Sequence, residues 1–218
     1  EFIKDNIKET INSKAGRNTD GKNIFNGALY FWDHFGQANS HNLGAYVGGY
    51  ATYTLVGGAK AYSNDARINN NGSHGNKIPG QYIPVGQGFF VIAVNDSLTN
   101  SLTTTTINGG DIVFKNSQRI FKKEGAGNSV FMKGVKSKND TTEIENNNDK
   151  RPKIWLKFDS PSGYHRQLLI GTDENTTNYF DLGFDAFIAD VGNEDMFWTF
   201  DGAKFVIQGV PNFDDNQE

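Results

Sequence analysis

The carboxylates of one acidic stretch, residues 173–195, have the clearest potential for chemistry. They lie among loop-forming Asn, Thr and Gly residues, and hard oxygens in loops are the ligands that Ca²⁺ prefers. The spacing does not match an EF-hand loop, and turns in which Asp or Asn bonds its own backbone explain the same composition. A structural calcium ion is therefore the one candidate cofactor, with these ligands: Asp173, Asp181, Asp185 and Asp190.

Tyrosines beside or within the long polar loops form a second candidate site. A flat ring covers the apolar face of a sugar, and nearby amide, carboxylate and guanidinium groups bond its hydroxyls. The three tryptophans, Trp32, Trp155 and Trp198, lie within strand patterns, so we expect them to be buried. The residues predicted to bind a ligand are Tyr46, Tyr50, Tyr62, Asn64, Asp65 and Arg67.

Patterns typical of catalytic sites are missing from the sequence. There is no G-x-S-x-G elbow and no H-E-x-x-H pair, and with 0 cysteines a thiol nucleophile and thiolate zinc sites are excluded. The four histidines, His34, His41, His74 and His165, are expected to be ordinary loop or surface residues. We predict that the chain is not an enzyme; the alternative is an enzyme whose carboxylates assemble only in the fold.

The charge balance argues against nucleic acid as a partner. The formal net charge is −4, and the basic clusters are short and interleaved with acids, so no Lys/Arg stripe could displace counterions from phosphates. No run approaches the roughly 20 apolar residues that span a bilayer. We expect no membrane insertion, and we expect the chain to be a piece of a longer protein.

Short alternating segments rich in aromatic residues predict strands, and the strand spacing without interposed helices predicts a sandwich. One amphipathic helix is expected at residues 1–14. The Asp201-Gly202 pair predicts a tight hairpin. The fold class is all-β, an antiparallel β-sandwich or jelly roll with one short N-terminal helix and long loops. The expected strands are 28–33, 49–55, a strand–turn–strand unit at 82–94, a hairpin at 112–121, and 153–159, 164–171, 196–200 and 204–208.

One domain, residues 1–218, is the simplest organisation. Residues 136–151 are charged, rich in Asn and nearly free of apolar side chains, a composition typical of a flexible loop or linker. If they form a linker, the chain divides into residues 1–135 and 152–218.

Several motifs together resemble a module of large secreted proteins of Bacteroidetes, especially flavobacteria. The resemblance covers residues 28–209 and rests on these segments: LYFWDH (29–34), GGYATYTL (48–55), YIPVGQGFFV (82–91), VFKNSQRIF (113–121), KIWLKFD (153–159) and YHRQLLIGTDENTTNYFDLGFDA (164–186). Such modules typically lie near the C-terminus of cell-surface proteins and adhesins, before a sorting domain of the type IX secretion system.

The resemblance implies an extracellular or cell-surface location and a structural or adhesive role without catalysis. The expected partners are neighbouring domains of the same polypeptide, and glycans or proteins of the surroundings. The alternative is a carbohydrate-binding module attached to a secreted polysaccharide-active enzyme.

Overall fold

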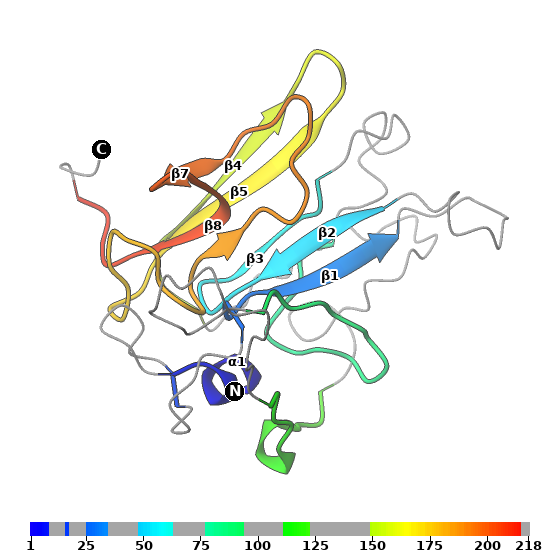
Figure 1. Ribbon diagram of the computed structural model, residues 1–218, viewed down its shortest axis with the longest axis vertical. Coiled ribbons are helices and arrows are strands. Elements are labelled where there is room, and N and C mark those ends of the chain that lie inside the picture. The colour runs from blue at the N-terminus through cyan, green and yellow to red at the C-terminus, as the bar shows by residue number, and fades with distance from the viewer. Residues whose placement is uncertain are drawn as a thin grey trace, which may run out of the picture.

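The chain folds into two β-sheets with one short helix at its N-terminal end (Figure 1). The structure is a computed structural model, and it describes residues 1–8, 16–17, 25–34, 48–62, 77–93, 111–122 and 149–214. Strands dominate the regular structure of these residues. The prediction of an all-β fold is confirmed.

The first sheet is antiparallel, in the order β1-β2-β3. Its strands are β1 (Leu29–His34), β2 (Gly48–Tyr53) and β3 (Gly58–Ala59). The alternating aromatic segments predicted β1 and β2 to within two residues at each end. On the outer side of β1, Tyr30 and Phe90 exchange two backbone hydrogen bonds of 2.9 and 2.7 Å, so residues near Phe90 cover that edge.

The second sheet is mixed, in the order β4-β5-β8-β6, with β7 also paired to β8. The β5–β8 pair is parallel, because the chain crosses over between them through residues 173–202, whereas the other pairs are antiparallel. The sheet therefore departs from the wholly antiparallel arrangement expected. Its strands are β4 (Lys153–Asp159), β5 (His165–Thr172), β6 (Ala186–Phe187), β7 (Trp198–Phe200) and β8 (Ala203–Val210).

The hairpin between β7 and β8 forms at the predicted pair. Asp201 and Gly202 have positive φ angles of 48° and 76°, as a two-residue hairpin turn requires. Two other predictions are wrong. Residues 82–93 form isolated bridges rather than strands, and residues 111–122 hold the short 3-10 helix η2 (Asn116–Gln118) in place of a hairpin.

The N-terminal helix α1 (Phe2–Asn6) is shorter than the predicted window, whose end lies outside the described residues. Its apolar face is the expected one, since Ile3 and Ile7 are buried. Asn6 holds the segment before η2 in place, donating to the Val113 carbonyl at 3.0 Å and accepting from the Val113 N–H at 2.7 Å.

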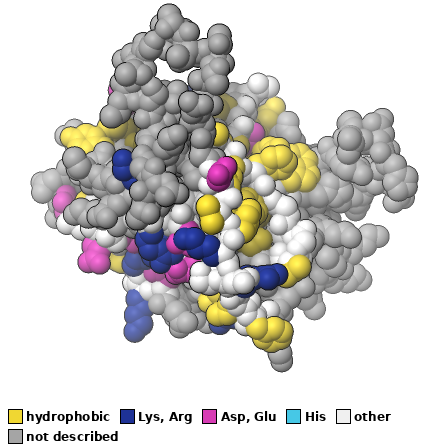
Figure 2. Space-filling view, turned by 60° about the horizontal axis from the view of Figure 1, so that its bottom comes forward, with side chains coloured by type: hydrophobic (Ala, Val, Ile, Leu, Met, Phe, Trp, Pro, Cys, Tyr) yellow, Lys and Arg dark blue, Asp and Glu magenta, His cyan; other side chains and the backbone are white. Residues whose placement is uncertain are grey.

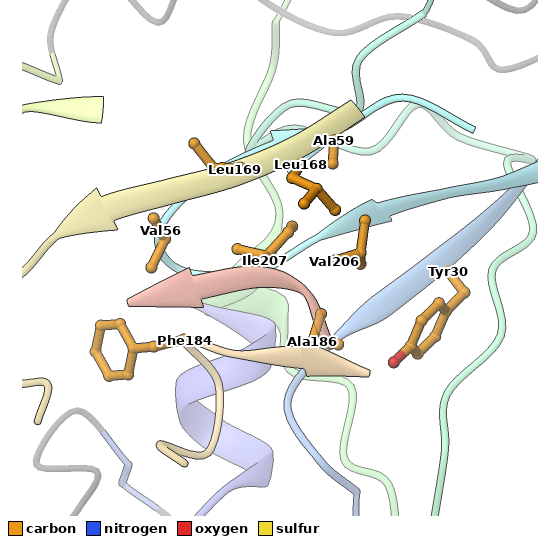
Figure 3. Packing of buried hydrophobic residues seen from close by; sticks show 10 residues of the cluster. Tyr30, Val56, Ala59, Leu168, Leu169, Phe184, Ala186, Val206 and Ile207 are labelled. Carbon is orange, nitrogen blue, oxygen red and sulfur yellow. The ribbon is translucent and has the colours of Figure 1, made fainter. Parts of the chain in front are cut away.

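Buried apolar side chains of the described residues form two clusters, one between α1 and the first sheet and one to which both sheets contribute (Figure 3). Side chains from residues 28–59 and from residues 168–207 lie together in the second cluster, so the two sides of the 136–151 segment pack together. The labelled members are Tyr30, Val56, Ala59, Leu168, Leu169, Phe184, Ala186, Val206 and Ile207.

Two glycines meet where the segment before β1 crosses the segment before β6. Gly183 donates its N–H to the Asn26 carbonyl at 3.1 Å. A Cβ added to Gly27 would lie 2.3 Å from the Gly183 Cα, and Gly27 has a φ of +80°. Only a residue without a side chain fits, so this crossing fixes how the two sheets approach each other.

Basic and acidic side chains lie together on the face shown in Figure 2, with apolar side chains on other parts of it. This mixture agrees with the ion pairs near α1, where Arg17 binds Glu1 at 2.5 Å and Asp5 at 2.9 Å. Within the part of the chain that the structure describes, no helix is long and apolar enough to cross a membrane.

Candidate functional site

The predicted ligand-binding residues are only partly described. Tyr46, Asn64, Asp65 and Arg67 lie outside the described residues, whereas Tyr50 and Tyr62 lie within them. Tyr50 is on β2, and Tyr62 follows β3. These two tyrosines have different environments, so they are considered separately.

Tyr62 is not free to meet a ligand, in contrast to the prediction. It is 8% exposed. Its ring stacks on Tyr164 with the centroids 5.8 Å apart, the Arg166 guanidinium lies 4.2 Å from the ring centroid, and its hydroxyl donates to the Glu194 carbonyl at 3.2 Å. The residues that cover Tyr62 come from a segment about 100 positions away, which the local sequence could not reveal.

Arg166 is at the centre of a buried ion pair. It makes two hydrogen bonds to the Asp195 carboxylate, at 2.8 and 2.6 Å, and one to the Asp190 carbonyl at 2.6 Å. Both side chains of the Arg166–Asp195 pair are 2% exposed. Burial acts to raise the pKa of Asp195, but the bonds and charge of Arg166, together with the N–H groups of Gly192 and Met196, outweigh it and hold this pKa below its ordinary value. Sequence reasoning missed this pair, which joins β5 to the loop before β7.

The predicted calcium ligands each have a partner within the fold. Asp173 pairs with Arg151, and Asp190 with Arg166 at 3.5 Å. Asp173 also accepts from the Asn175 N–H at 2.9 Å, which is the Asx turn that the composition suggested as an alternative. Asp181 accepts from the Thr177 N–H at 2.6 Å. Among the described residues, no three Asp, Glu or His side chains gather in a group that could hold a metal ion.

Asp185 joins two distant parts of the backbone. Its carboxylate accepts from the Asp181 N–H and from the Gly209 N–H, both at 2.6 Å. Burial raises the pKa of Asp185 to about 8, and that of Asp181 to about 6. This carboxyl ties the turn before β6 to the end of β8, which is a structural role.

Asp33, near the end of β1, is a buried carboxyl without full hydrogen bonding. It is 2% exposed, and its Oδ2 has no hydrogen-bond partner among the described residues. Burial raises the pKa of Asp33 to about 7, although the charge and backbone N–H of Lys77 act in the opposite direction. An ionised carboxyl group at this buried position lowers the stability of the fold, because its charge has lost its contact with water.

We expect Asp33→Asn to remove part of the pH dependence of stability. The folded pKa, about 7, is above the ordinary value of 3.8. The contribution of Asp33 to the free energy of unfolding is therefore complete below pH 3.8 and is lost as the pH rises through about 7. The loss is about 4 kcal/mol at most. Urea unfolding at pH 4.5 and pH 8 should show the variant gaining stability relative to wild type at pH 8. An unchanged difference between the two pH values would contradict this assignment.

His165, at the start of β5, was expected to be an ordinary surface residue. Its Nδ1 pairs with the Asp159 carboxylate at the end of β4, and the Asp159 side chain is 72% exposed. The His165 Nε2 is buried and has no partner among the described residues. The other histidine side chains, of His34, His41 and His74, lie outside the described residues.

Three rings form an aromatic cluster on the first sheet. Tyr50 lies edge-on to Trp32, its cross-strand neighbour, with the centroids 5.1 Å apart, and edge-on to Phe90 at 5.6 Å. Phe90 is 59% exposed, and Tyr50 and Trp32 are partly exposed. Of the predicted ligand-binding residues that the structure describes, Tyr50 is the one whose ring can take part in a surface contact.

Strand β4 exposes three successive large apolar residues. Ile154, Trp155 and Leu156 are 47%, 42% and 39% exposed. The expectation that Trp155 is buried is therefore wrong, although its indole N–H donates to the Gly58 carbonyl at 3.2 Å. The reason is position: β4 ends the sheet and, among the described strands, pairs only with β5. An exposed apolar edge is a ready template for pairing with another chain.

Comparison with known proteins gives one match. The model of a family described as a domain of unknown function, DUF8693, matches residues 2–218. No curated protein and no solved structure matches the chain.

Proposed function

The chain belongs to the DUF8693 family, since the family model spans nearly all of it, and we propose that it is a non-enzymatic interaction module of a secreted or cell-surface bacterial protein. Its role is structural or adhesive: it holds neighbouring domains in place and makes contacts through its surface. The sequence resemblance to surface modules of Bacteroidetes supports the location.

The exposed edge of β4 carries this proposal. Soluble monomers usually protect such edges with charge, proline, a bulge or a covering segment, yet the middle of β4 is the apolar run Ile154, Trp155 and Leu156, each more than a third exposed. An edge of this kind suits a protein whose task is to join other chains.

The use of the buried acidic side chains also supports a framework role. Asp185 and Asp181 bond backbone N–H groups, and Asp195 is bound to Arg166. These groups hold loops and strands to each other. In an enzyme we would expect groups with shifted pKa values to converge on a common cleft.

Surface labelling of the producing cells tests the location. An antibody against residues 1–218 should stain intact cells, and mild protease treatment of intact cells should remove the stain. A cytoplasmic marker is the control, because it should stain only after permeabilisation. Stain that appears only in permeabilised cells would overturn the proposed location.

Carbohydrate binding is the second candidate function, favoured by the aromatic cluster of Trp32, Tyr50 and Phe90. Stacking of one ring on a sugar contributes about 1 kcal/mol, so Phe90→Ala should weaken binding several-fold. Affinity electrophoresis in gels containing plant or marine polysaccharides measures this as reduced retardation. Val85→Ala is the control, because Val85 is fully exposed and lies outside the cluster. If no polysaccharide retards the wild type, this candidate fails and the adhesive role is unaffected.

A further inference from the structure

We propose that β4 pairs antiparallel with β4 of a second copy of this chain, about a two-fold axis at Leu156. This deepens the proposed function, on which it rests, by naming the partner of the exposed edge. Pairing would join the second sheets of two copies into one continuous sheet.

The direction of the backbone groups along β4 sets which residues can pair. At one end, the Pro152 carbonyl accepts from the Thr172 N–H at 3.0 Å, and at the other, the Ser160 N–H donates to the Tyr164 carbonyl at 2.9 Å. Both contacts point toward the β5 side. Backbone groups alternate in direction along an antiparallel strand, so even-numbered residues face β5. The odd-numbered residues present their N–H and C=O groups at the other edge of β4, which no described strand covers and which we call the free edge.

The free-edge residues of β4 complement themselves in charge. With the axis at Leu156, Lys153 lies opposite Asp159 of the second copy, and Trp155 lies opposite Lys157. Opposite charges and cation–π pairs across strands stabilise a sheet. Lys153 already binds Asp149 at 2.7 Å, and Asp159 contacts His165 of its own chain, so the pairing would bring these two groups of side chains together.

The adjacent registers are disfavoured by like charges. Hydrogen bonding pairs odd residues with odd residues, so the nearest alternative registers place the axis at Trp155 or at Lys157. An axis at Trp155 places Lys153 opposite Lys157, and an axis at Lys157 places this lysine opposite itself. Like charges directly opposite each other destabilise strand pairing. Of these three registers, which keep most of β4 paired, only the axis at Leu156 keeps the two lysines apart.

The other face of β4 adds an apolar contact in the same register. Side chains alternate between faces, so Ile154, Leu156 and Phe158 point to one side. Pairing sets Leu156 against Leu156 and Ile154 against Phe158 of the second copy. Ile154 and Leu156 are 47% and 39% exposed in the single chain, and they would lose water on association.

Cross-linking through an introduced cysteine tests the register directly, because the chain has 0 cysteines of its own. In the proposed pairing, the two Cα atoms at position 156 form a non-hydrogen-bonded pair about 4.5 Å apart, within disulfide range. Leu156→Cys should therefore yield a covalent dimer under mild oxidation, seen on a non-reducing gel.

Ile154→Cys is the matched control on the same strand. The two residues at position 154 would be offset by four positions, about 13 Å, too far for a disulfide. We expect it to cross-link at least about tenfold more slowly than Leu156→Cys. Equal rates for the two variants would overturn the register.

Sedimentation equilibrium of the unmodified chain measures association itself. One strand pair buries a small interface, so the dimer should be weak and should grow with protein concentration up to about 1 mM. Lys157→Pro removes a free-edge N–H while leaving the β4–β5 bonds, and should abolish dimerisation with little change in Tm. Val85→Lys, at a fully exposed site away from β4, should leave dimerisation unchanged.

A wild type that stays monomeric throughout would overturn the dimer. The proposed function fails separately, because it depends on staining of intact cells and not on self-association.

Discussion

Asp195→Ala is expected to destabilise the fold by about 3–5 kcal/mol, the cost typical of removing one partner of a buried ion pair. The Arg166 guanidinium would keep its buried position, with 2% of the side chain exposed, but would lose both bonds to Asp195 and keep only the longer contact of 3.5 Å with the Asp190 carboxylate. The same carboxylate accepts from the Gly192 and Met196 N–H groups, so the loop before β7 would loosen too. Urea unfolding at pH 7 measures the change.

Two further variants distinguish the cost of leaving the Arg166 charge buried without Asp195 from the cost of losing any ion pair. Glu1→Ala removes an ion pair with Arg17 whose side chains are 58% and 45% exposed, and pairs of this kind contribute only about 0–1 kcal/mol. Adding Arg166→Met to Asp195→Ala should recover part of the loss, because the buried guanidinium that has lost Asp195 is then removed, although Asp190 gives up its 3.5 Å contact with Arg166. A loss for Asp195→Ala no larger than that for Glu1→Ala would contradict the assigned role.

Gly27→Ala should cost about 2–5 kcal/mol, as the sum of a left-handed backbone penalty and a steric clash. Its new Cβ would lie 2.3 Å from the Cα and 2.4 Å from the N of Gly183. Both are backbone atoms of a segment bonded at each side, to Asn26 and to Leu55, so they cannot move away cheaply. Thermal unfolding should show a large fall in Tm or no cooperative transition.

Gly86→Ala is the matched control for this clash. Gly86 has a φ of +86°, close to the +80° of Gly27, and a Cβ there would meet nothing within 4 Å. Gly86→Ala should therefore lose only the stability that a left-handed backbone costs a residue with a side chain, about 1–2 kcal/mol. The difference between the two variants isolates the contact between Gly27 and Gly183, and equal losses would show that the crossing tolerates a side chain.

Local patterns predicted the strands that pair continuously. The alternation in residues 28–33 and 153–159, and the Asp201-Gly202 turn, each specify an element without distant information. The 82–94 unit has the same alternation and a turn at Gly86, but its described residues form isolated bridges, Phe90 to Tyr30 and Ala93 to Phe25, rather than a continuous ladder. Strand pairing is a tertiary property, so a pattern alone could not distinguish these cases.

The candidate sites were less predictable because burial depends on distant segments. Alternation in KIWLKFD specifies a strand but not its place at the end of a sheet, so Trp155 was expected inside. Tyr62 was expected at the surface, yet Tyr164 and Arg166 cover it. In the acidic stretch, composition alone could not separate metal ligands from carboxylates that bond backbone N–H groups, as Asp181 does.

The position of β8 determines how the fold would bear tension. The strand lies inside its sheet, bonded in parallel to β5 on one side and antiparallel to β6 and β7 on the other, and Asp185 fastens its end through Gly209. A pull on the chain beyond Val210 acts along β8. The bonds to both neighbours are then loaded in shear and must break together, a geometry that suits a module through which force is transmitted.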